Sequence, residues 1–131
     1  MKIVIRMIVV VFLLGIINSC TKQVFVEAAP ELKIIVKDSD NDLVKGAEVS
    51  LYKTELDFLD QTNSIISGLT DSVGACLFKN LTDKNCYFYV QYENATNMWS
   101  ANYVDSLVAG KRFIVNTTLI SSDQNNLNIE L

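Results

Sequence analysis

Short runs of alternating apolar and polar residues, separated by turn-forming residues, dominate the chain after residue 30. Leu32, Ile34 and Val36 occupy every second position of the first run. Side chains that recur with a period of two lie on one face of a β-strand, so this run predicts a half-buried strand. The same pattern predicts further strands over residues 47–52, 64–70, 76–81, 86–92, 111–120 and 125–131. Seven short strands with turns between them indicate an all-β sandwich, because a lone hairpin cannot bury enough apolar surface.

The segments between these strands differ in how much they reveal. Residues 38–42 are rich in aspartate and asparagine, whose side chains bond to their own backbone in turns. Residues 71–74 end at Gly74, which can adopt a positive φ in a tight turn. Residues 54–62 are polar without a period and predict an irregular loop. Residues 94–109 fit no single period, and we expect a short helix near residues 104–109.

The beginning of the chain has a different character. Lys2 and Arg6 precede an apolar run over residues 7–17, and Ser19 and Cys20 follow it. A positive region, an apolar core and a small residue before a cleavage site are the layout of a secretory signal peptide. A membrane-spanning helix needs about 20 apolar residues, and this run is shorter. The sequence therefore predicts a signal peptide over residues 1–19.

The position of Cys20 directly after the apolar run and Ser19 resembles the lipobox of bacterial lipoproteins of the Bacteroidota type. The resemblance implies that Cys20 becomes the first mature residue and carries a diacylglyceryl thioether and an N-acyl chain such as palmitate. Two or more such chains anchor a protein stably. Residues 20–30 then form a lipidated tether and residues 31–131 the sandwich. An ordinary signal peptide followed by a disulfide-bonded cysteine is the alternative.

The same resemblance implies a location. Thr21, and not an aspartate, follows Cys20, which argues against retention in the inner membrane. We expect an outer-membrane protein held by the lipid on Cys20, on either the periplasmic or the cell-surface face.

Charge and composition exclude several classes of function. The net charge is −4 and becomes more negative by two when Lys2 and Arg6 leave with the leader. A nucleic-acid partner is therefore not expected, because binding phosphates needs a basic face. The chain contains no histidine, which excludes Ser-His-Asp catalysis and histidine-ligated zinc. We expect no cofactor, no metal and no enzymatic activity.

Two segments carry a second resemblance. Residues 43–52 read LVKGAEVSLY, and residues 67–81 read SGLTDSVGACLFKNL. Both are similar to transthyretin-like domains of the carboxypeptidase regulatory-like and Cna protein B-type families, and the matching region covers about residues 32–92. The resemblance implies a seven-stranded transthyretin-like Greek-key sandwich that serves as a spacer, stalk or accessory module. Fold alone does not fix function.

Activities known in these families do not carry over readily. The transthyretin-related hydroxyisourate hydrolases need histidines, which this chain lacks. The isopeptide bond of Cna protein B-type domains needs a lysine, an acid and a late asparagine, and Lys37, Glu93 and Asn128 lie at similar places. Lys37, however, shares its face with Lys33 and not with the apolar residues, so a solvated lysine is the preferred interpretation.

The aspartates at positions 38, 40 and 42 imitate the start of a calcium-binding EF-hand loop. The sixth position of such a loop is Leu43 instead of glycine, and the twelfth is Val49 instead of glutamate. The pattern therefore fails, and a solvated turn is expected.

Cys76 and Cys86 form a candidate disulfide, because an even number of remaining cysteines in an oxidising compartment favours a bridge. Both are expected on inward faces. In transthyretin-like folds their strands belong to opposite sheets, so a bridge would cross the core. Two buried free thiols that pack as small apolar groups are the alternative.

Met98, Trp99 and Tyr103 form a candidate contact patch within the ambiguous stretch. Exposed, they would mark an interaction site. Large aromatic residues are highly buried on average, so the preferred interpretation is that Trp99 plugs one end of the sandwich.

These observations predict a non-catalytic accessory, adhesion or protein-interaction module of the cell envelope, with an envelope protein or a glycan as its partner. A carbohydrate-binding module of an outer-membrane uptake system is the alternative. An interaction module predicts an apolar patch or an unpaired edge strand, a carbohydrate-binding module predicts exposed coplanar aromatic rings, and an enzyme predicts a concave pocket with convergent polar groups.

Overall fold

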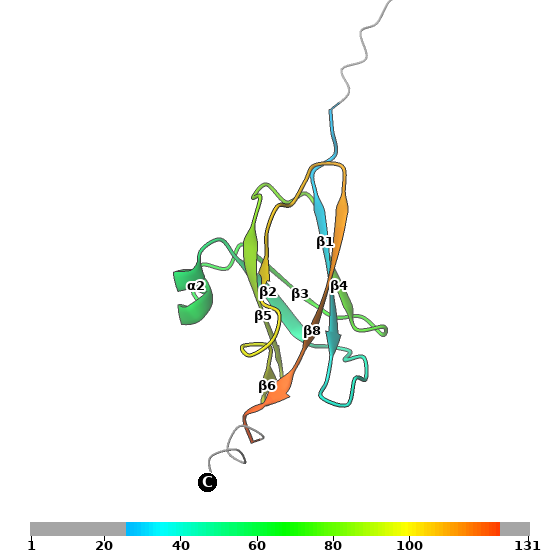
Figure 1. Cartoon of the computed structure of the whole chain (residues 1–131), viewed down its shortest axis with the longest axis vertical. Coiled ribbons are helices and arrows are strands. Elements are labelled where there is room, and N and C mark those ends of the chain that lie inside the picture. The colour runs from blue at the N-terminus through cyan, green and yellow to red at the C-terminus, as the bar shows by residue number, and fades with distance from the viewer. Residues whose placement is uncertain (1–25, 124–131) are drawn as a thin grey trace, which may run out of the picture.

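Two β-sheets pack face to face in the computed structural model, which describes residues 26–123 (Figure 1). Sheet A has the strand order β4-β1-β8, and sheet B has the order β3-β2-β5-β6-β9, with β7 also pairing with β5. One short helix, α2, lies outside sheet B. The predicted all-β class is confirmed. The elements are β1 (Glu31–Lys37), β2 (Glu48–Tyr52), α2 (Glu55–Asp60), β3 (Ile66–Leu69), β4 (Ala75–Phe78), β5 (Cys86–Tyr92), β6 (Ala95–Thr96), β7 (Tyr103–Val104), β8 (Arg112–Thr118) and β9 (Ile120–Ser121).

Strand β1 lies in the middle of sheet A. It pairs antiparallel with β4 and parallel with β8, with Ile34 opposite both Cys76 and Val115. Alternate residues of β1 are buried, as the sequence predicts. Residues from both sheets complete one core; they include Leu32, Ile34, Val36, Val49, Leu51, Phe78, Phe88 and Val90.

Helix α2 corrects the prediction of an irregular loop over residues 54–62. The Thr54 side chain accepts a hydrogen bond from the Asp57 N–H at 3.2 Å and donates its hydroxyl proton to the Asp57 carboxylate at 2.8 Å. The cap satisfies the Asp57 N–H, one of the backbone donors that the first turn of a helix leaves free, and the second bond holds the Thr54 hydroxyl in place. Phe58 is the buried residue of α2, and its ring stacks on that of Tyr87 at 5.8 Å. A helix of this length is not stable in isolation, so the packing of the Phe58 ring stabilises it.

Other boundaries also differ from the predictions. The expected helix near residues 104–109 is wrong, because Val104 ends β7 and the residues after it form a loop, in which Ser106 has a φ of +61° and the Leu107 N–H donates to the Lys84 carbonyl at 2.7 Å. The strand predicted over residues 111–120 divides at Leu119 into β8 in sheet A and β9 in sheet B. The period of two over residues 86–92 predicts Tyr92 on the same inward face as Cys86, Phe88 and Val90, but Tyr92 is 38% exposed at the end of β5. The strand predicted over residues 125–131 lies outside the described residues, as does the leader.

The turn over residues 71–74 has the predicted form. The Asp71 carboxylate accepts hydrogen bonds from the Val73 and Ala75 N–H groups, and these bonds lower the pKa of Asp71, that from Ala75 most. Gly74 has a φ of +68°, and a Cβ there would meet the Val36 carbonyl oxygen at 2.8 Å. Both its conformation and this close approach of β1 therefore require glycine.

A buried hydroxyl joins the crossover between the two sheets. Thr70 Oγ1 accepts a hydrogen bond from the Ala47 N–H at 2.8 Å and donates to the Val44 carbonyl at 2.6 Å. Val44 in turn donates its N–H to the Val36 carbonyl of β1 at 3.0 Å. The connection from sheet A to sheet B is thus fastened to the end of β3 by this side chain together with two backbone hydrogen bonds of 2.9 Å, from the Gly46 N–H to the Thr70 carbonyl and from the Thr70 N–H to the Ala47 carbonyl.

Replacing Thr70 with valine keeps the shape and removes both bonds. The Ala47 N–H and the Val44 carbonyl then remain buried without a side-chain partner, so the free energy of unfolding should fall by about 2–4 kcal/mol. Urea denaturation followed by circular dichroism measures this. Thr82→Val, at an exposed threonine, is the matched control and should change stability by less than about 0.5 kcal/mol. Equal losses in the two variants would contradict the role of Thr70.

Candidate functional site

Strand β3 is an edge of sheet B with unpaired backbone groups. It pairs with β2 on one side only, with Val49 opposite Gly68 and Ser50 opposite Ser67. The N–H of Thr70 donates to the Ala47 carbonyl at 2.9 Å, and bonded pairs alternate along an antiparallel ladder. Gly68 therefore bonds toward β2. Ser67 and Leu69 turn their N–H and carbonyl groups away from the sheet.

This edge lacks the residues that usually protect one. Residues 62–70 contain no charged residue and no proline, whereas natural edge strands are commonly blunted by charges, proline or bulges. Apolar side chains are exposed along it: Leu69 is 67% exposed, and Ile65 and Ile66 are each more than two-fifths exposed. On the opposite sheet, the edge strand β8 begins with Arg112, which forms an ion pair with Glu31 at 2.7 Å.

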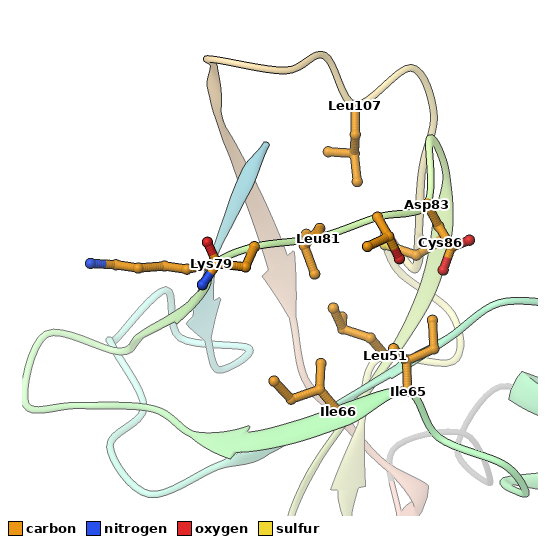
Figure 2. A pocket seen from close by; sticks show the side chains of 10 residues that line it. Leu51, Ile65, Ile66, Lys79, Leu81, Asp83, Cys86 and Leu107 are labelled. Carbon is orange, nitrogen blue, oxygen red and sulfur yellow. The ribbon is translucent and has the colours of Figure 1, made fainter. Parts of the chain in front are cut away.

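An apolar cavity of about 130 Å³ lies beside the start of β3 (Figure 2). Figure 2 shows Ile65 and Ile66 on one side of it, Leu81 across from them and Leu107 pointing in from the loop above. Strands of sheet B, the segment after β4 and the loop after β7 line it, so the cavity lies between the inner face of sheet B and these two connecting segments at this end of the sandwich. The lining residues are Leu51, Ile65, Ile66, Lys79, Asn80, Leu81, Thr82, Asp83, Cys86 and Leu107.

The two described cysteines are buried free thiols. Burial, with a smaller contribution from the Asp83 carboxylate, raises the pKa of Cys86 to about 11. Burial, with a contribution from Asp71, also raises the pKa of Cys76. A thiol is a nucleophile only as thiolate, so neither residue is prepared for covalent catalysis.

The register explains why the candidate disulfide is absent. Cys76 and Cys86 lie on strands of opposite sheets, as the resemblance implied. The Cys76 sulfur lies 2.9 Å from the position that a Cβ would take on Gly68. Val49 of β2 is opposite both Gly68 of β3 and Val90 of β5, so Cys76 lies at the same height in the sandwich as Val90. Cys86 is four residues from Val90 along β5, or about 13 Å. A disulfide requires Cα atoms within about 7 Å.

An aromatic cluster covers the outer face of sheet B beneath α2. The Phe58 ring packs edge-on against Tyr52 and Tyr89, each at 6.3 Å, and stacks on Tyr87. Tyr103 of β7 packs on Tyr87 at 4.6 Å. These rings contact one another, so the cluster works mainly as a second small core.

A polar groove of about 110 Å³ adjoins this cluster. Its lining residues are Glu48, Ser50, Tyr52, Gln61, Tyr89 and Gln91. The Ser50 and Ser67 hydroxyls at its side share a hydrogen bond of 2.7 Å. The groove offers amide and carboxylate groups, but Tyr52 is buried, so little aromatic ring face is available to a ligand.

The interpretation that Trp99 plugs one end of the sandwich is wrong, because its side chain is 75% exposed. Trp99 lies in the turn between β6 and β7, which is fixed by fully buried Asn97. The Asn97 side chain accepts from the Val90 N–H at 2.8 Å and donates to the Phe88 carbonyl at 3.0 Å. Of the candidate contact patch, Trp99 is thus exposed on a rigid turn, Met98 is half-buried, and Tyr103 belongs to the aromatic cluster.

The remaining candidates have simpler environments. The Asp38 carboxylate accepts bonds from the N–H groups of Asp40 and Asp42, as expected of a turn. Within residues 26–123, no group of three or more potential acidic, histidine or cysteine ligands gathers at one place. No helix in the same range is long and apolar enough to cross a membrane. Glu93 is exposed in a turn. Cys20 and Asn128 lie outside the described residues.

The thiols give a direct test of the core. In the folded protein at pH 8, Cys76 and Cys86 should react slowly with Ellman's reagent, because burial removes access and the raised pKa of each removes thiolate. Both should react quickly in denaturant. A Thr82→Cys variant supplies an exposed thiol as the control for fast reaction in the native state. Air-purified protein without these two reactive thiols in denaturant would instead indicate a disulfide.

Comparison with known proteins identifies a fold and no family. No protein-family model matches the chain, and no curated protein matches it. Among solved structures, the chain is similar to one described as the Bacillus anthracis TIE protein, with a TM-score of 0.52 and 11% sequence identity. The similarity covers 72% of this chain but 17% of that one. The likeness supports the two-sheet β architecture alone, since fold does not determine function.

Proposed function

We propose that this chain is an envelope lipoprotein whose sandwich is a non-catalytic protein-interaction module that docks an extended segment of a partner at β3. The observation that carries the proposal is the exposed, uncharged edge formed by Ser67 and Leu69, whose backbone groups face away from β2. A strand added to such an edge gains affinity from main-chain hydrogen bonds and specificity from alternate side chains.

The anchor is proposed from the leader. Lys2 and Arg6, the apolar run over residues 7–17 and Ser19-Cys20 together match a lipoprotein leader. Lipid chains on Cys20 hold the protein at the outer membrane, on its periplasmic or cell-surface face. The segment before β1 is then a tether.

A transthyretin-like topology is the proposed finer fold. Three features support it: the turn at Gly46, with a φ of +79°, that precedes β2; the Asp71–Gly74 turn; and buried Phe78 in β4. These are the positions on which the resemblance to carboxypeptidase regulatory-like and Cna protein B-type domains rests.

A carbohydrate-binding role remains the second candidate, because the groove near Gln61 and Gln91 groups amides with a carboxylate and tyrosines. The aromatic rings beside it pack on Phe58 instead of standing free as a stacking platform. At the β3 edge, by contrast, the N–H and carbonyl groups of Ser67 and Leu69 point away from β2 and can bond to an added strand. Protein interaction is therefore the stronger proposal.

The anchor is tested by Cys20→Ser in the native host. The wild type should incorporate labelled palmitate and fractionate with membranes, and Cys20→Ser should lose both. Cys76→Ala, which removes a buried thiol, is the control and should keep both. Membrane fractionation of a Cys20→Ser form without palmitate would rule out the lipid anchor.

The docking edge is tested by photo-crosslinking in the same host. A benzoylphenylalanine at Ser67 should form a defined product with a protein partner, and the same residue at Asn116 of edge strand β8 should not. Adding Leu69→Lys should abolish the product, because a lysine on an edge opposes strand addition. Val73→Lys, at another exposed apolar residue, is the matched control. A product that survives Leu69→Lys, or that contains only glycan, would contradict docking at β3.

A further inference from the structure

We infer that the cavity beside β3 is a specificity pocket, which takes one leucine-, isoleucine- or phenylalanine-sized side chain from the docked segment. The inference rests on the proposed function and names its partner: an extended segment of another protein with one such apolar anchor next to an acidic residue.

The position of the cavity follows the expected path of an added strand. Ile66 is opposite Leu51 in the β2–β3 register, and both side chains line the cavity. A strand bound along β3 continues sheet B, and its side chains alternate between the outer and the inner face of that sheet. The cavity lies against the inner face beside Ile66, so an inward side chain of the added strand near Ile66 reaches it.

The volume and lining of the cavity determine which side chain of the docked segment can enter it. Its volume is about 130 Å³, and an apolar cavity of about 150 Å³ lined by leucine, isoleucine and phenylalanine accepts benzene. Five of the ten lining residues are leucine or isoleucine, with Leu81 and Leu107 across the cavity from Ile66 (Figure 2). One branched aliphatic or phenyl group therefore fits, whereas an indole is too large.

The charged residues around the cavity indicate which residue the docked segment carries next to its apolar anchor. Lys79 lines the rim, is exposed, and points away from the cavity in Figure 2. Among the described residues Lys79 has no ion-pair partner, whereas Asp83 at the other side pairs with Lys53 at 3.5 Å. The β3 edge itself is uncharged. A carboxylate beside the anchor complements Lys79 without desolvating another ion.

Synthetic peptides test the pocket with the full mature chain carrying Cys20→Ser. The probe is a capped, threonine-rich peptide with a glutamate on each side of one central residue, which is alanine, leucine or tryptophan. Titration to about 1 mM, the weak end of specific association, is followed by NMR on the Ser67 and Leu69 amides and the Ile66 and Leu107 methyl groups. The leucine peptide should bind at least about tenfold more tightly than the alanine or tryptophan peptide.

Variants of the cavity wall test whether the preference for the leucine peptide arises in the cavity. Leu107→Phe extends a buried wall residue into the cavity and should remove the preference for leucine over alanine while the Ser67 and Leu69 amides still shift. Val108→Phe, at the exposed neighbour, should keep the preference. Replacing the glutamates by lysines should weaken binding several-fold at low salt, with a smaller difference at high salt.

The outcomes separate this inference from the proposed function. If no peptide binds, docking at β3 is wrong and the pocket inference falls with it. If all three peptides bind equally with shifts at Ser67 and Leu69, the edge docks a strand and the pocket inference alone is wrong. A preference that survives Leu107→Phe, with unperturbed Ile66 and Leu107 methyl groups in the wild type, would also overturn the pocket. Tighter binding of the lysine peptides would overturn the acidic neighbour.

Discussion

The hydrogen bonds of Thr70, made by its hydroxyl and by its backbone, hold the connection between the two sheets on which the rest of the structure depends. They fasten the chain where it crosses from β1 to β2, with Val44 bonded to Thr70 on one side and to Val36 on the other. The end of β3 is thereby closed against the crossover. The start of β3, at Ile65 and Ile66, lies at the other end of the strand, where the cavity opens between sheet B and the segments after β4 and β7. Strand β3 is therefore hydrogen-bonded to the connecting segment at its Thr70 end and borders the cavity at its Ile66 end.

Strands that form a half-buried face could be predicted from sequence, because burial imposes the period directly. In β1 and β5, alternate residues from Leu32 and from Cys86 face the core. Where side chains instead of periodicity determine the structure, prediction failed. α2 depends on the Thr54 cap and on one ring, Phe58. β6 and β7 are two-residue strands, and the buried amide of Asn97 bonds the turn between them to β5. Such contacts have no repeat in the sequence.

The site was predictable only in part. The absence of charge over residues 62–70 is visible in the sequence, but the position of β3 at an edge follows from the order of strands in sheet B. The alternation of inward and outward residues along a strand correctly predicts that Cys76 and Cys86 face the core. It does not predict how far apart the two residues lie along the strand direction. Trp99 was misplaced because average burial describes a residue type, whereas its exposure here follows from a turn that Asn97 fixes.

The central place of β1 has a mechanical consequence. The chain enters the sandwich through β1, whose register with parallel β8 runs from Glu31 opposite Arg112 to Lys37 opposite Thr118, while β4 pairs along its other side. A pull on the segment before residue 31 acts along the strand, nearly in line with it (Figure 1). Such a load shears the bonds on both sides of β1 together instead of opening them one at a time. Held from its N-terminal side, the domain therefore resists extraction through β1 and its two neighbours, while β3, in the other sheet, lies outside the loaded strands.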